Sequence, residues 1–166
     1  MLEMGAVPFD GAHRAERVLS DLRANSEEPW LSEVSIIEHD AKGRYSVKAK
    51  NPSVDDGHTG SGAAVGGLTG VFVGLIGGPL GLLFWGTMGA LAGGSIGAAR
   101  ESAFKPMIDQ LEGRLARDAS MLVLVGETPA IDSFVGATSV RGGEVLRSPL
   151  TSAQAAELDQ AVPAIA

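Results

Sequence analysis

The residues of this chain whose side chains could do chemistry are three histidines and the members of one polar cluster. His13, His39 and His58 are dispersed along the sequence and lack the spacing of metal ligands. In the segment Asp55-Asp56-Gly57-His58, two carboxylates and an imidazole could hold a divalent ion or respond to pH. We favour a solvated linker that caps the following segment, and we expect His13 to be an exposed residue in the first turn of a helix.

Glycine motifs give no catalytic signature. Gly60, Gly62 and Gly66 form a loose G-x-G-x-x-x-G, but no acidic residue follows about twenty positions later, as a dinucleotide site requires. The run Gly57–Gly62 is followed by Ala63 instead of Lys, so it is no phosphate-binding P-loop. The sequence also lacks a G-x-S-x-G elbow. We therefore predict no catalytic, cofactor-binding or metal-binding residue, and a protein that is not an enzyme.

Composition narrows the class of protein. The 166 residues include no cysteine, which excludes disulfides and thiolate zinc sites. The chain has thirteen Lys and Arg residues and twenty Asp and Glu residues, which give a net charge of −7. This charge argues against nucleic acid as a partner, because phosphate backbones favour basic surfaces. The first residues show no basic stretch followed by an apolar run, so we expect no secretory signal.

The elements that must position any site lie in two charged flanks. In the first flank we predict a short strand, Met4–Phe9, which Gly5 and Pro8 make a poor one. Asp10 is expected to cap the helix that follows, whose apolar stripe is Ala12, Ala15, Leu19 and Leu22. A β-hairpin is predicted next, with strands over 33–38 and 44–50 around the turn 40–43.

The second flank begins with a predicted amphipathic helix, Arg100–Arg117. The run Met121–Val125 is apolar at every position, so this strand needs cover on both faces, from a neighbouring subunit or from the chain's own C-terminal elements. A short helix over 131–137 and a strand over 143–147 follow. Thr151 to Gln154 resembles a capping box that opens a last helix ending at Val162.

Without its middle segment, the chain reads strand–helix–strand–strand–helix–strand. That order predicts an α+β fold, a ferredoxin-like split βαβ domain interrupted by a glycine-zipper α-helical hairpin. We divide the chain into residues 1–58, the N-terminal half of this domain; 59–99, the hairpin; 100–150, the C-terminal half; and 151–166, a C-terminal helix and tail.

The middle segment is uncharged and its glycines are periodic. From Thr59 to Ala99 there is no Asp, Glu, Lys or Arg. Glycines recur at intervals of four in two series, one from Gly62 to Gly78 and one from Gly81 to Gly97 in which Trp85 takes one position. This is the spacing with which GxxxG faces let two helices approach closely. We expect these glycines to mediate helix packing and oligomerisation: Gly62, Gly66, Gly70, Gly74, Gly78, Gly81, Gly89, Gly93 and Gly97.

The segment is long enough for two helices that span a bilayer. Its limbs, Thr59–Gly77 and Gly81–Ala99, are each about 28 Å long as helices, close to the hydrocarbon thickness. A hairpin returns both flanks to one side, and basic residues beside it, such as Lys48 and Arg100, predict that side to be the cytoplasm. The predicted location is the cytoplasmic membrane, with a purely cytoplasmic protein as the alternative.

The same residues resemble a known family. The chain is similar to the bacterial "domain of unknown function 1269" family. The similar features are Phe9-Asp10, the strand pair around a D-x-x-G turn, the glycine-rich apolar segment, the apolar strand Met121–Val125 and the late run 142–150. The resemblance implies a bacterial, membrane-associated or assembling protein. It brings no catalytic motif and no site residue.

These observations predict a non-enzymatic membrane-associated protein that assembles with itself through its glycine-zipper hairpin. The expected partners are copies of the same chain and membrane lipid. One alternative is a soluble assembly protein, such as a shell, tube or large oligomer with interlocking hairpins. Another is a ligand-binding regulatory module that uses the sheet face, a hypothesis that depends on fold analogy alone.

Overall fold

Most of the described chain consists of two strand–helix–strand units. The computed structural model describes residues 1–43, 45–48, 106–107 and 109–161. In chain order the elements are β1 (Leu2–Asp10), α1 (Arg14–Asn25), the 3-10 helix η1 (Pro29–Ser32), β2 (Ser35–His39), β3 (Tyr45–Lys48), β4 (Ala119–Glu127), α5 (Thr128–Thr138), β5 (Leu146–Pro149) and α6 (Ser152–Ala161).

The two flanks complete one antiparallel sheet, in the order β3-β2-β4-β1-β5. Strand β4, from the second flank, lies between β2 and β1, both from the first. Leu122 pairs with Val7 on one side and with Ile36 on the other. The α+β class is therefore confirmed, together with the expectation that the separated flanks share a sheet.

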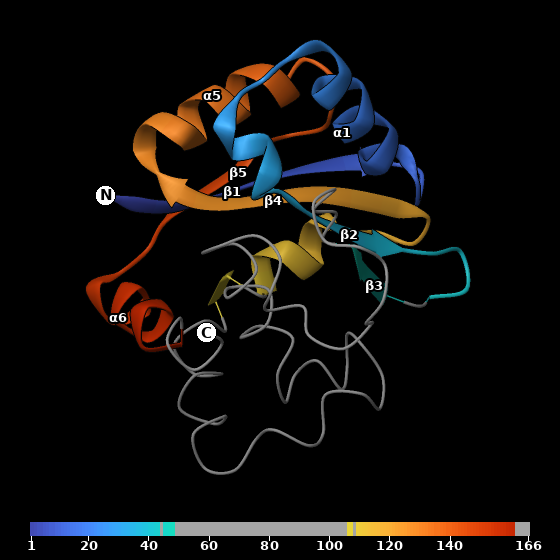
Figure 1. The fold of residues 1–166 in the computed structure, drawn as a ribbon. Helices are drawn as coiled ribbons and strands as arrows, with labels where there is room; N and C mark the ends of the chain where they lie inside the picture. Colours follow the sequence, from blue (N-terminus) through green and yellow to red (C-terminus); the bar gives the residue numbers. More distant parts are fainter. Residues whose placement is uncertain (44, 49–105, 108, 162–166) are drawn as a thin grey trace, which may run out of the picture.

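Helices cover the sheet from both faces. Helices α1 and α5 lie on one face, where α1 joins β1 to β2 and α5 joins β4 to β5 (Figure 1). The helical residues 106–107 and 109–114 lie on the other face. The predicted helix Arg100–Arg117 therefore does not share a face with α1. Its described part ends at residue 114, because residues 115–118 turn the chain into β4.

Strand β1 runs the full nine residues despite Gly5 and Pro8. A Cβ at Gly5 would lie 3.1 Å from the Phe134 ring, so the missing side chain makes room for α5. Pro8 pairs with Met121 of β4, and its carbonyl accepts a hydrogen bond from the Gly143 N–H on the opposite side. The N–H and the carbonyl of one residue point to the same side of a strand, so position 8 directs both away from β4. On that side β5 pairs with β1 only as far as Ala6. No described strand therefore needs the N–H donor that proline lacks.

The core fills both faces of β4. On the side of α1 and α5, Leu122 and Leu124 pack with fully buried Phe134, whose ring meets Trp30 edge-on with 5.4 Å between centroids. On the other side the buried apolar residues include Met121, Val123, Val125, Met4, Ile37, Met107, Leu111 and Leu158. The expectation of cover on both faces of Met121–Val125 is confirmed within the chain itself.

Of the two predictions about helix caps, the one for α1 is wrong and the one for α6 is confirmed. Asp10 does not cap α1: it is the last residue of β1, and the capping position belongs to His13, whose side chain makes no capping bond. The capping box of α6 is present, because the Thr151 N–H donates to Gln154 Oε1 at 2.8 Å and the Gln154 N–H donates to Thr151 Oγ1 at 3.2 Å.

The predicted hairpin, residues 59–99, lies outside the described residues, as does the polar cluster Asp55–His58. Among the residues that the structure does describe, no helix has both the length and the apolar character that crossing a bilayer requires.

Candidate functional site

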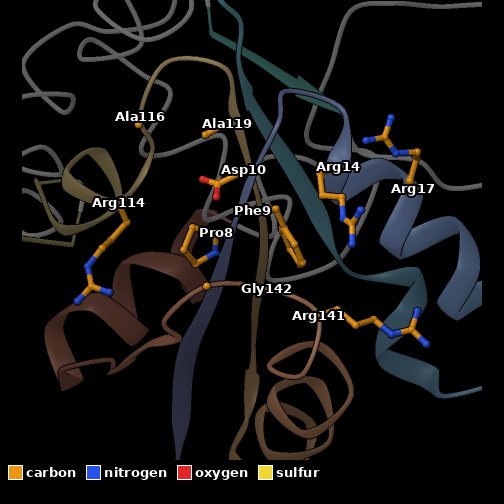
Figure 2. A pocket seen from close by; sticks show the side chains of 11 residues that line it. Pro8, Phe9, Asp10, Arg14, Arg17, Arg114, Ala116, Ala119, Arg141 and Gly142 are labelled. Atoms are coloured by element: carbon orange, nitrogen blue, oxygen red, sulfur yellow. The ribbon is translucent and has the colours of Figure 1, made fainter.

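A cleft of about 510 Å³ opens where β1 meets the start of α1 (Figure 2). Four separate parts of the chain line it: the end of β1 with the start of α1, the end of the helical stretch 109–114, the start of β4, and the loop after α5. Its lining residues are Pro8, Phe9, Asp10, Arg14, Arg17, Arg114, Ala116, Ala119, Arg141, Gly142 and Gly143.

Arg14 and Arg17 are placed by an unusual cap of α1. The first amides of a helix lack partners within it. Here the Ala15 N–H donates to Ser120 Oγ of β4 at 2.9 Å, while that hydroxyl donates to the Gly11 carbonyl at 2.7 Å. The bonds fix α1 against β4, and the exposed side chains of Arg14 and Arg17 extend from its first turns.

Two glycines bring the loop after α5 flat against β1. A Cβ at Gly142 would lie 2.5 Å from Val7 Cγ1 and 2.9 Å from Phe9 Cε1. The next residue, Gly143, donates its N–H to the Pro8 carbonyl at 2.8 Å. Arg141 directly precedes this contact and forms an ion pair with Asp21 of α1. The loop therefore holds Arg141 above the same end of the cleft as α1.

Arg114 approaches from the other side. It is the last residue of the helical stretch 109–114, and its guanidinium lies 3.2 Å from Glu144. Figure 2 shows Arg114 on one side of Pro8 and Gly142, with Arg14, Arg17 and Arg141 on the opposite side and Asp10 between them.

The cleft concentrates positive charge on an acidic protein. Its lining holds four guanidinium groups and one carboxylate, Asp10, although the chain carries a net charge of −7. Arginine presents a planar set of donors that matches carboxylate and phosphate oxygens. This arrangement can bind an anionic molecule. Among the described residues that line the cleft there is no histidine, serine or lysine that could act as a nucleophile.

A second cluster joins His13, Glu16 and Glu38. One potential ligand atom of each lies within 4.8 Å of the others, and His13 Nδ1 lies 3.3 Å from Glu38 Oε1. Imidazole and carboxylate ligands of this kind could hold a divalent transition metal. His13 is exposed, as the sequence predicts, and β2 brings Glu38 beneath the start of α1, next to His13. His39 ends β2, and its Nδ1 lies 3.1 Å from the Leu115 carbonyl.

One ion-pair network outside the cleft shifts a pKa. Arg147 of β5 contacts Glu3 Oε2 and Asp132 Oδ1, each at 2.6 Å. The hydrogen bond from Arg147 holds the pKa of the Glu3 carboxyl below its usual value, against the opposing effect of burial. This network joins the edge strand to α5 and β1, and it serves the fold.

The residues that the sequence singles out for function are not those of the cleft. The nine predicted packing glycines, Gly62 to Gly97, lie outside the described residues. Sequence reasoning missed the cleft because its four arginines come from three distant segments. One signal was present: Arg14 and Arg17 stand one helical turn apart beside an apolar stripe.

Comparison with known proteins identifies a family and nothing further. Residues 61–163, more than half of the chain, match the model of a family described as "Protein of unknown function (DUF1269)". No curated protein and no solved structure matches the chain.

Proposed function

The chain belongs to the family described as protein of unknown function DUF1269, and we propose that it is a non-enzymatic, membrane-associated protein that assembles with itself through its glycine-rich segment. The matched residues, 61–163, begin inside that segment and continue into the C-terminal half of the α+β domain. Family membership thus joins the uncharged segment to the folded domain, which supports a role for both.

The observation that carries the proposal is the 41-residue stretch without a charge, inserted between two strands of one sheet. Residues 59–99 lie between β3 and β4, and the strands on either side of the insertion share a sheet. The insertion must therefore begin and end on one domain, as a helical hairpin would. Glycine faces at a four-residue spacing favour close helix packing within the hairpin or between copies.

We also propose that the domain is ferredoxin-like. The units β1–α1–β2 and β4–α5–β5, with the order β2-β4-β1-β5, correspond to a split βαβ arrangement. In this interpretation β3 is an added edge strand, and the insertion lies in the connection between the two halves. The second helix is then α5 and not the predicted helix over 100–117.

The native mass of the full chain, with and without detergent, tests the main proposal. Recovery in the membrane fraction and a discrete oligomer in detergent are expected. A discrete high-mass particle without detergent would favour the soluble assembly protein, the first alternative. A monomer under both conditions would contradict self-assembly in either form.

The cysteine-free chain allows the predicted orientation to be tested with single cysteines. A cysteine at Gly78, in the predicted turn, should react with a membrane-impermeant maleimide in intact spheroplasts. A cysteine at Ser20, exposed on α1, should react only after permeabilisation. Labelling of Ser20→Cys before permeabilisation would contradict the cytoplasmic placement of the flanks.

A second candidate function is favoured by the cleft. The alternative of a ligand-binding regulatory module gains support from four arginines around one depression of about 510 Å³. This candidate does not compete with self-assembly, because the described residues that line the cleft are not those of the glycine-rich segment. A ligand-induced rise in the Tm of the full chain would support it.

A further inference from the structure

We propose that the arginine cleft binds a soluble organic molecule that carries two phosphoryl groups at separated ends. This inference depends on the second candidate function, the regulatory module, and gives its ligand a chemical class. It is independent of whether the chain assembles through its glycine-rich segment.

Two guanidinium groups of the cleft have no partner among the described residues. Arg14 and Arg17 are exposed, and the guanidinium group of neither forms a hydrogen bond or an ion pair with a residue that the structure describes. The N-terminal amides of α1 contribute less, because the Ala15 N–H is already bonded to Ser120 and the Ala12 N–H to Asp118. Side chains and not the helix end therefore supply the positive charge.

The other two arginines have partners that a ligand could replace. Arg141 is paired with Asp21 and Arg114 with Glu144, and the side chains of these acids are 54% and 80% exposed. Ion pairs at such exposed positions contribute little to stability, so their exchange for a stronger anion costs little. A phosphoryl group offers more charge and more acceptor oxygens than a single carboxylate.

The shape of the cleft favours two phosphoryl groups on one organic body. Arg114 stands on one side, and Arg14, Arg17 and Arg141 stand on the other (Figure 2). The floor between them is formed by Pro8, Phe9 and the flat Gly142-Gly143 contact. A volume of about 510 Å³ lies in the range of small-molecule sites and exceeds what a single inorganic ion fills.

Arg114 also connects the ligand to the rest of the chain. It ends the helical stretch 109–114, which follows the insertion, whereas Arg14 and Arg17 belong to α1. A molecule that contacts both Arg114 and the arginines of α1 connects the helical stretch 109–114 to α1, on the opposite face of the sheet. Binding at the cleft therefore has a direct covalent route by which it could influence residues 59–99.

Isothermal titration calorimetry of the full chain tests the proposal with a matched pair of probes. Fructose 1,6-bisphosphate carries two separated phosphoryl groups, and fructose 6-phosphate carries one. We expect the bisphosphate to bind about tenfold more tightly or better, because each charge-assisted contact contributes on this scale. Equal affinity for the two probes, or no heat from either at millimolar concentration, would overturn the proposal.

Variants assign the binding to the cleft. Arg14→Gln should weaken bisphosphate binding about tenfold, and Arg114→Gln should remove the advantage of the bisphosphate over the monophosphate. Asp10→Asn should tighten binding, since it removes the one carboxylate of the lining. Lys42→Gln, which removes a charge from the exposed turn between β2 and β3, is the matched control and should change affinity less than twofold. An equal loss in Lys42→Gln would show unspecific attraction and overturn the assignment.

The outcome is separable from that of the main proposal. Native mass should be unchanged in Arg14→Gln and Arg114→Gln, and circular dichroism should confirm that both variants fold. A vesicle test distinguishes a soluble ligand from a lipid. If the protein sediments with phosphatidic acid vesicles and the bisphosphate does not release it, the cleft binds a lipid surface, and the proposal of a soluble ligand is overturned.

Discussion

The Ser120 hydroxyl accepts a hydrogen bond from the Ala15 backbone N–H at 2.9 Å, across 105 residues of sequence. Ser120 is fully buried at the start of β4, and Ala15 lies in the first turn of α1. The same hydroxyl donates to the Gly11 carbonyl. One side chain of the second flank thereby caps the first helix, which links the halves of the domain beyond their shared sheet.

Ser120→Ala is expected to destabilise the protein by about 1–2 kcal/mol, because it removes a helix cap and leaves buried polar groups without a partner. Urea unfolding followed by circular dichroism measures the effect. Ser20→Ala, at an exposed position of the same helix, is the matched control and should stay within about 0.5 kcal/mol of the wild type. Equal effects in the two variants would contradict the capping role of Ser120.

Gly142→Ala should destabilise the domain by about 1–3 kcal/mol, because its Cβ would overlap Val7 and Phe9. Differential scanning calorimetry should show a lower Tm. Gly136→Ala is the control: nothing lies within 4 Å of a Cβ at Gly136 in α5, so this variant should be neutral or more stable by up to about 1 kcal/mol. A Tm for Gly142→Ala at or above that of the wild type would mean that the loop does not lie flat on β1.

Stability should depend on pH through Glu3. Its pKa in the folded protein is lowered by Arg147, so the unfolded chain binds the proton more readily. The resulting stabilisation is present above the unfolded pKa, near 4.5, and is lost as the pH falls through the lower folded pKa. Glu3→Gln should therefore be less stable than the wild type at pH 7, and the difference should shrink below pH 4.5.

Urea unfolding at a series of pH values measures this difference. Glu112→Gln removes a carboxylate at an exposed position of the helical stretch 109–114 and provides the control. A difference between wild type and Glu3→Gln that grows as the pH falls would show that the pKa of Glu3 is not lowered.

Gly70→Leu and Gly93→Leu should disrupt assembly, because a bulky side chain holds packed helices apart. Light scattering after size exclusion in detergent should report a smaller particle for each variant than for the wild type. His58→Ala, at the start of the glycine-rich segment, should leave the mass unchanged. If Gly70→Leu forms an unaltered oligomer, the glycine face does not pack against a helix.

Most of the fold could be predicted from local patterns. The apolar stripe of α1, the alternation in the β2–β3 hairpin, the apolar run of β4 and the capping box of α6 depend on residues a few positions apart. At two places distant residues decide the outcome. The poor strand Met4–Phe9 became the nine-residue β1, because Phe134 packs over Gly5 and β5 ends before Pro8. Asp10 does not cap α1, because Ser120 does.

The candidate site was much less predictable than the fold. The sequence by itself determined the strands and helices, the faces that must be buried and the uncharged segment, since periodicity and charge act over one or two helical turns. Only the tertiary structure decided that β4 lies between β1 and β2, that Arg114 and Arg14 lie on opposite sides of one cleft, and that Glu38 lies beside His13. The register of a sheet brings such residues together, and no local pattern records which strand lies beside which.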